Sequence, residues 1–215
     1  MPRLEIDGPD DIGGGRIVTV VNLHLRAPLA APVAGQKLGP FSWRTVGGWA
    51  EGFFLAGVKR AGQALEARLL VEQLFDANPD ALAVVAVDLN ADIYEVPLRI
   101  LQAELGEVGN AAVASRALFP IEDVIPQAQR FSVLHHNRRL MLDHLLVSAK
   151  LRTYLTCAES LNQNLADEVD SAEQGAVGGS FHAPLLAEFA LSSGQAPECQ
   201  PNQGGDNEST ENRDD

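Results

Sequence analysis

The chain has 215 residues, 46% of them hydrophobic, and a formal net charge of -13 at pH 7. This length supports one globular domain, and no apolar run approaches the roughly 18 residues that a membrane span needs. The acidic balance, still -8 over residues 1–197, counts against a nonspecific nucleic-acid binder but not against phosphoesters, which an acidic site can meet through a bound divalent cation.

The N-terminal residues 1–15 are polar and acidic, and we interpret them as a short lead-in. They do not form a signal peptide, so we expect a cytoplasmic protein. Residues Arg16–Leu25 (RIVTVVNLHL) are rich in β-branched and aliphatic side chains, which predicts a buried strand with His24 near its end. Cys157 and Cys199 are far apart in the sequence and predict no disulfide framework.

Residues 27–57 contain many Gly and Pro residues and both tryptophans, Trp43 and Trp49. We predict a long ordered loop here, with the tryptophans either lining a cleft or packing in the core. Residues Val58–Ala77 have strong helix formers throughout, and the helix should end before the Asn-Pro pair that follows.

Residues Ala81–Val87 (ALAVVAV) are wholly apolar, as is typical of a strand buried on both faces. The predicted strand runs directly into Asp88-Leu-Asn90. A second helix is predicted over about Val96–Leu105.

Two strands joined by a turn near Asn137 are predicted from the sequence FSVLHHNRRLMLDHLLVS. A polar, Gly-rich stretch over residues 159–179 precedes a final strand at Ala183–Leu191. Residues 193–215 contain almost no apolar side chains, so they predict a disordered acidic tail.

Taken singly, the polar landmarks each allow two interpretations. Asp88 and Asn90 can form a turn in which they bond their own backbone, or they can bind a cation or a phosphate. His24 and His182 can be core histidines that donate to backbone carbonyls, or they can act in acid-base chemistry.

Asp143 lies in the apolar segment LMLDHLLVS, where a carboxylate needs a partner to offset its desolvation. A histidine would serve, because a buried aspartate that accepts its hydrogen bond fixes the tautomer and raises the basicity of the ring. Strand alternation places His144 on the opposite face, where we expect a structural role.

The motifs VVNLHL, a helix with Arg60 and Gln63, VVAVDLNAD, RRLMLDHLLVS and SFHAPLLAEF follow one another in this order. Together they resemble the endonuclease/exonuclease/phosphatase (deoxyribonuclease-I-like) superfamily, over a domain spanning residues 16–192. The resemblance implies an α/β fold of the four-layer α/β sandwich type, with two sheets face to face and helices outside. It also implies a phosphoester hydrolase of the phosphodiesterase, nuclease or phosphatase type that uses Mg²⁺ or Mn²⁺.

The resemblance also carries site residues over to this chain. His24 matches a histidine that contacts the scissile phosphate or acts as an acid. Asp88 and Asn90 match a pair that orients the nucleophile and holds phosphate or metal. Asp143 matches the aspartate that pairs with the catalytic base, and His182 matches that base.

Two departures from the family pattern concern the metal. Phe181 stands where the family has the aspartate of its S-D-H motif. Only 15 residues precede the first matching strand, so we expect a partial sandwich that lacks the N-terminal strands and their metal-binding glutamate. Glu5 and Asp7 are too close in the sequence to the first matching strand to replace the missing elements and their glutamate. We therefore expect the metal to bind weakly.

A noncatalytic interpretation stays open beside the enzyme. A truncated remnant or half-domain would expose one sheet, through which it could bind a complementary chain or self-associate. The substrate class is open as well, because small molecules, lipids and nucleic acids all occur as substrates in the superfamily.

Overall fold

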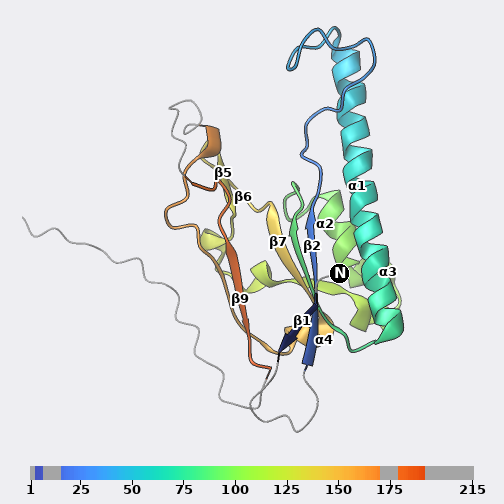
Figure 1. The fold of residues 1–215 in the computed structure, drawn as a ribbon, viewed down its shortest axis with the longest axis vertical. Helices are drawn as coiled ribbons and strands as arrows, with labels where there is room; N and C mark the ends of the chain where they lie inside the picture. The colour runs from blue at the N-terminus through green and yellow to red at the C-terminus, as the bar shows by residue number, and fades with distance from the viewer. Residues whose placement is uncertain (1–2, 7–15, 170–178, 192–215) are drawn as a thin grey trace, which may run out of the picture.

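The computed structural model describes residues 3–6, 16–169 and 179–191. It confirms a mixed α/β fold, in which helices cover one face of a five-stranded sheet and a two-stranded sheet covers the other (Figure 1). Three of the four expected layers are thus present in the described residues. In chain order the elements are β1 (Arg3–Ile6), β2 (Arg16–His24), α1 (Val46–Ala77), β3 (Leu82–Asp88), α2 (Val96–Gln102), α3 (Leu105–Val108), η1 (Ala111–Arg116), β4 (Leu118–Pro120), η2 (Ile121–Val124), η3 (Gln127–Gln129), β5 (Val133–His135), β6 (Arg138–Leu140), β7 (Asp143–Ser148), α4 (Ala149–Arg152), β8 (Leu155–Ser160) and β9 (Leu185–Phe189).

The central sheet has the strand order β1-β2-β3-β7-β4. Strands β2 and β3 are parallel, whereas β7 runs antiparallel to β3. The registers pair His24 with Asp88 and Asp88 with Asp143. Three polar residues therefore lie side by side at the ends of three neighbouring strands.

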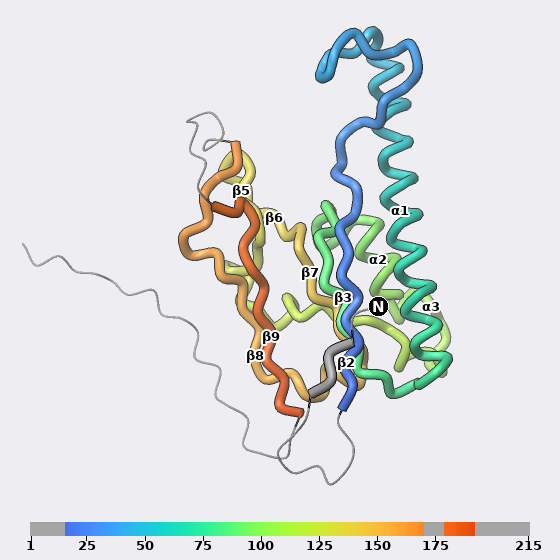
Figure 2. Tube along the Cα trace, in the orientation of Figure 1, coloured from blue at the N-terminus to red at the C-terminus, as the bar shows by residue number. Residues whose placement is uncertain are grey.

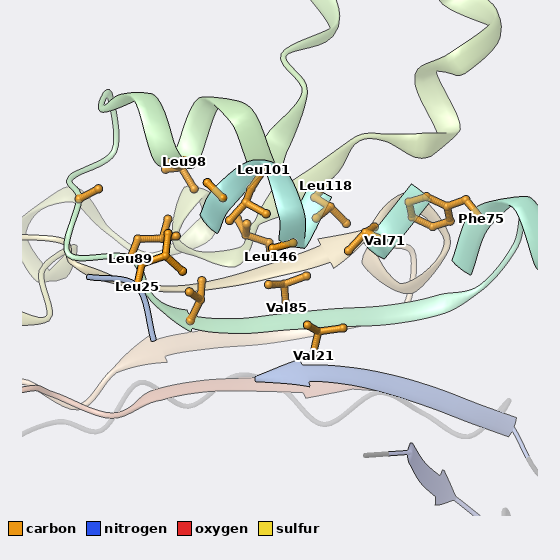
Figure 3. Close-up of a cluster of buried hydrophobic side chains, with 14 residues drawn as sticks. Val21, Leu25, Val71, Phe75, Val85, Leu89, Leu98, Leu101, Leu118 and Leu146 are labelled. Carbon is orange, nitrogen blue, oxygen red and sulfur yellow. The ribbon is translucent and has the colours of Figure 1, made fainter. Parts of the chain in front are cut away.

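The main core lies between this sheet and the helices (Figure 3). Val71 and Phe75 of α1 and Leu101 of α2 are fully buried against Val85 of β3 and Leu146 of β7. The buried side chains on the strands alternate with others that face the opposite side, as the pleat requires. This packing holds the ends of β2, β3 and β7 in a fixed arrangement.

The second face of the sheet packs against β8 and β9, which pair antiparallel. Val18 and Val147 are buried there, and Ala158, Ala187 and Phe189 pack against them. No described helix is long and apolar enough to cross a membrane.

Helix α1 begins twelve residues before the predicted start, so the loop predicted over residues 27–57 is wrong over its last twelve residues. Thr45 caps the helix by accepting a hydrogen bond from the amide of Gly48 at 2.9 Å. Two glycines of this segment, Gly48 and Gly52, are closely packed instead. A Cβ on Gly52 would lie 2.3 Å from the carbonyl oxygen of Ala31.

Most other elements match their predictions, with shifted boundaries. Strands β2, β3 and β9, the end of α1 and the turn at Asn137 are confirmed, although β6 and β7 divide the second strand of the predicted pair. The second helix ends early at Gln102, because the left-handed Ala103 interrupts it. The sequence does not signal β8 or β1.

Cys157 on β8 is disulfide-bonded, contrary to the prediction. Sequence separation is a poor guide to which sulfurs meet in space. Cys199 and the predicted tail lie outside the described residues.

Candidate active site

The ends of three neighbouring strands bring His24, Asp88 and Asp143 together. Each residue is aligned with the next in the strand register. Side chains at paired positions point to the same face of a sheet. The three side chains therefore line an open cleft of about 710 Å³ on the face that carries β8 and β9.

His182 reaches this cleft from the segment before β9. Its Nδ1 lies 2.7 Å from Oδ2 of Asp143, a hydrogen-bond distance. The backbone of His182 forms an isolated bridge with Val133, and the amide of Ala183 donates to the carbonyl of Ser132. The predicted pairing of Asp143 with His182 is thus present as a contact, and its catalytic role stays a prediction.

Ser132 is a site residue that the sequence analysis missed. Its hydroxyl accepts hydrogen bonds from the amides of Leu142 and Asp143, both at 3.0 Å. Its carbonyl holds Ala183, next to His182. A serine in an irregular segment carries no sequence signal of such a role.

Asp88 lies between the two histidines of the cleft. Its Oδ2 is 3.6 Å from Nε2 of His24 and 4.0 Å from Nδ1 of His182. The Asp88 side chain is 15% exposed and that of His24 is 73% exposed. Asp88 is therefore a partly desolvated carboxylate at the floor of a site that stays open to solvent.

Asn90 adopts a left-handed backbone with φ 48°. Its amide N–H donates to Oδ1 of Asp88 at 2.9 Å, and its Nδ2 donates to the carbonyl of Leu25 at 3.0 Å. The self-bonded turn considered from the sequence is therefore real. It leaves Oδ2 of Asp88 available, so the turn orients the carboxylate and does not exclude a functional role.

Arg60 and Gln63 of α1 support the same edge. Nη1 of Arg60 donates to the carbonyl of Asn90 at 2.8 Å, and its Nη2 forms an ion pair with Glu95. The side-chain carbonyl of Gln63 accepts from the amide of Arg26. The helix thus braces the chain just beyond the ends of β2 and β3.

Asp88, Asp143 and His182 could together hold a metal ion, because one ligand atom from each lies within 4.8 Å of the others. Nδ1 of His182 is already hydrogen-bonded to Asp143, so the carboxylate oxygens of Asp88 and Asp143 and Nε2 of His182 are the atoms left for a cation. Mg²⁺ accepts such a site, because it is commonly held by one or two carboxylates together with substrate phosphates. The residues therefore fit a divalent cation with few protein ligands.

The other positions considered from the sequence differ from one another. Asn90 lies beside Asp88, and its role as a metal ligand stays a prediction, whereas Phe181 is half-buried and has no ligand atom. The register of β1 places Glu5 opposite Ile17, about 23 Å along β2 from His24. Within the described residues, the metal group therefore has two carboxylates and one imidazole.

His144 points to the helix side of the sheet, as strand alternation predicts, and is fully buried. Its Nδ1 contacts the buried carboxylate of Glu122, and its Nε2 lies 2.9 Å from the carbonyl of Ala91. Burial alone lowers the pKa of His144, but the hydrogen bond and charge of Glu122 and the Ala91 carbonyl outweigh it and raise the pKa above its ordinary value. Through the Ala91 carbonyl, His144 therefore contacts the chain next to the turn that carries Asp88 and Asn90.

Comparisons with known proteins leave the family open. No protein-family model matches the chain, and no curated protein matches it. Among solved structures, it is similar to a 3′ phosphatase, NExo, from Neisseria bound to a product DNA hairpin, with TM-score 0.46 and 18% identity. The alignment covers 85% of this chain and 67% of that one. A likeness this distant assigns no function, so the function is inferred from the site alone.

Proposed function

We propose that the protein is a metal-dependent phosphoester hydrolase, with a catalytic domain over residues 16–192 and His182 as the general base. The observation that carries this proposal is the 2.7 Å hydrogen bond between Nδ1 of His182 and Asp143. Asp88 shares the cleft and lies 4.0 Å from the same nitrogen. An oriented imidazole beside two carboxylates is a site suited to activating water.

The hydrogen bond to Asp143 sets the tautomer of His182. When Nδ1 donates to the carboxylate, Nε2 is left without a proton and can accept one from water. The side chain of His182 is 36% exposed, so water can reach the ring. The imidazolium that forms is stabilised by the carboxylate of Asp143.

Asp88 and Asp143 would hold Mg²⁺ or Mn²⁺, with Asn90 beside them. When bound, the cation supplies stabilisation of negative charge on the phosphoryl oxygens. His24 is exposed and lies 3.6 Å from Asp88, so it can contact the phosphate or give a proton to the leaving group.

The proposal is tested by hydrolysis of bis-para-nitrophenyl phosphate and para-nitrophenyl phosphate, with Mg²⁺, with Mn²⁺ and with EDTA. We expect activity that needs the metal and falls at least about 100-fold in His182→Ala and in Asp88→Ala. Asp80→Ala is a matched control, because Asp80 is exposed at the opposite end of β3. His136→Ala serves likewise for His182, because His136 is exposed in the β5–β6 turn. Activity that survives both site substitutions would refute the assignment.

A second candidate function is a noncatalytic half-domain that binds a complementary chain or a second copy. The observation in its favour is that β9 pairs only with β8 within the described residues, in a sheet of two strands. An unpaired edge is a template for strand addition. Absence of turnover with either metal, together with concentration-dependent dimers in analytical ultracentrifugation, would favour this candidate over the enzyme.

A further inference from the structure

Residues 27–59 form an arm that follows β2 directly and projects beyond the sheets (Figures 1 and 2). The arm consists of the irregular segment 27–45 and the first half of α1. It begins three residues after His24, so its base adjoins the edge of the sheet that carries the candidate site.

The arm exposes an unusual amount of apolar surface. Phe41 is 95% exposed and Phe54 is 67% exposed, although large aromatic side chains are normally at least partly buried. Over Val46–Val58 the only charged residue is Glu51. Trp49 and Phe53 are in ring contact, and exposed apolar side chains that gather in this way mark an interaction site. The exposed large apolar residues of the arm are Leu29, Leu38, Phe41, Val46, Trp49, Phe53, Phe54 and Val58.

The exposed face of the helix is not the one that packs within the arm. The segment 27–45 contacts the helix on the face that carries Gly48 and Gly52. The amide of Ala31 donates to the carbonyl of Gly52 at 2.8 Å, and the Trp43 ring packs close to Gly52. Gly48 is packed equally closely against Gln36. On the outer side, Trp49 and Phe53 stack on each other with ring centroids 5.4 Å apart.

The charge of the arm is opposite to that of the rest of the chain. Residues 27–59 hold Lys37, Arg44 and Lys59 against Glu51, a net charge of +2, which leaves -15 elsewhere. In the part of the chain that the structure describes, none of the three cations is in an ion pair. The ammonium of Lys37 lies over the Trp43 ring, 4.2 Å from its centroid. The surface therefore fits an anionic partner with an apolar interior.

We propose that the arm docks on an anionic phospholipid surface. Aromatic and aliphatic side chains flanked by Lys and Arg are the composition of segments that lie in the bilayer interface. Nucleic acid fits less well, because Leu29, Val46 and Val58 offer no ring on which a base can stack. A second copy docked arm to arm also fits less well, because the two arms carry the same positive charge.

The negative body of the protein does not prevent this docking. The helical part of the arm, Val46–Val58, is about 20 Å long. That is about two and a half times the Debye length of roughly 8 Å at physiological ionic strength, so charges of the body beyond the far end of the arm are largely screened from an anionic surface. The proposal concerns binding alone and holds whether or not the cleft is catalytic.

Vesicle binding tests the proposal on the full chain. We expect cosedimentation with vesicles of phosphatidylglycerol and phosphatidylcholine, and weak binding to pure phosphatidylcholine. The chain has two tryptophans, so in a Trp43→Phe background the emission of Trp49 should shift to the blue on binding. The double variant Phe53→Ser/Phe54→Ser should bind at least about tenfold more weakly.

The matched control is Leu65→Ser/Leu69→Ser, which removes exposed apolar side chains from the same helix outside the arm. It should bind like the wild type. Failure to bind anionic vesicles, or equal loss in both double variants, would overturn the proposal. Without vesicle binding, dimers in analytical ultracentrifugation or capture of single-stranded DNA that the Phe53/Phe54 variant abolishes would assign the arm to those partners instead.

Discussion

Glu122→Gln should destabilise the fold, most strongly at acidic to neutral pH. The side chains of Glu122 and His144 are 1% and 0% exposed. The two ring nitrogens of His144 face oxygen atoms of Glu122 and of the Ala91 carbonyl, and the raised pKa of His144 favours the ring that carries protons on both nitrogens. The pair is thus a buried imidazolium and carboxylate. Removing one partner from such a pair costs about 3–5 kcal/mol, a large share of the roughly 5–15 kcal/mol that stabilises a domain.

The pH dependence follows from the raised pKa of His144. A histidine whose pKa is higher in the folded than in the unfolded state stabilises the fold fully below its unfolded pKa, about 6.5. This stabilisation is lost as the pH rises through the raised pKa. The difference in unfolding free energy between wild type and Glu122→Gln should therefore be greatest below about pH 6.5 and shrink at higher pH.

Urea denaturation followed by circular dichroism over a pH series measures this difference. Glu107→Gln is the control, because Glu107 forms an exposed ion pair with Arg99 and should cost no more than about 1 kcal/mol. If Glu122→Gln costs no more than the control, or its cost is unchanged across the series, the buried imidazolium is refuted.

Three further substitutions test other parts of the structure. Asp143→Asn should lower kcat by about 100- to 10,000-fold, because it changes the partner of the proposed base. The urea midpoint should stay near that of wild type, because the core is unchanged. Steady-state kinetics and parallel urea denaturation separate the two effects. Phe75→Ala should cost about 3–5 kcal/mol in urea denaturation, because the ring is fully buried, and a cost below about 1 kcal/mol would contradict the core. Gly52→Val should loosen the arm, because a Cβ there would lie 2.3 Å from the Ala31 carbonyl oxygen. Gly57→Ala is the control, because a Cβ on Gly57 meets nothing within 4 Å. Hydrogen exchange over the arm should be faster in Gly52→Val alone.

The central strands could be predicted from their β-branched and aliphatic residues. LAVVAVD is apolar up to its last residue, and RIVTVVNLH has a central run of such residues with His24 at its end. The order of the motifs then placed His24, Asp88, Asp143 and His182 in one candidate site, although no single motif was specific.

The remaining features depend on contacts that a single sequence does not record. The sequence predicts a loop over the first twelve residues of α1, because Gly48 and Gly52 look like helix breakers until the packed segment 27–45 is seen. Glu122 lies 22 residues from His144 in a short 3-10 helix, so nothing nearby in the sequence signals the pairing. Strand β8 mixes polar and apolar residues that are only partly buried, so it lacks a clear period.

Ser132 holds the backbone beside both His182 and Asp143, the proposed general base and its carboxylate partner. The hydroxyl of Ser132 accepts a hydrogen bond from the amide of Asp143. Its carbonyl accepts one from the amide of Ala183, the neighbour of His182. A displacement of this residue would carry the aspartate and the histidine in the same direction, so their separation is less sensitive to movement of the surrounding segments than either position alone. Such a common anchor lets an open, solvent-facing cleft keep a constant distance between two side chains that are 39 residues apart in the chain.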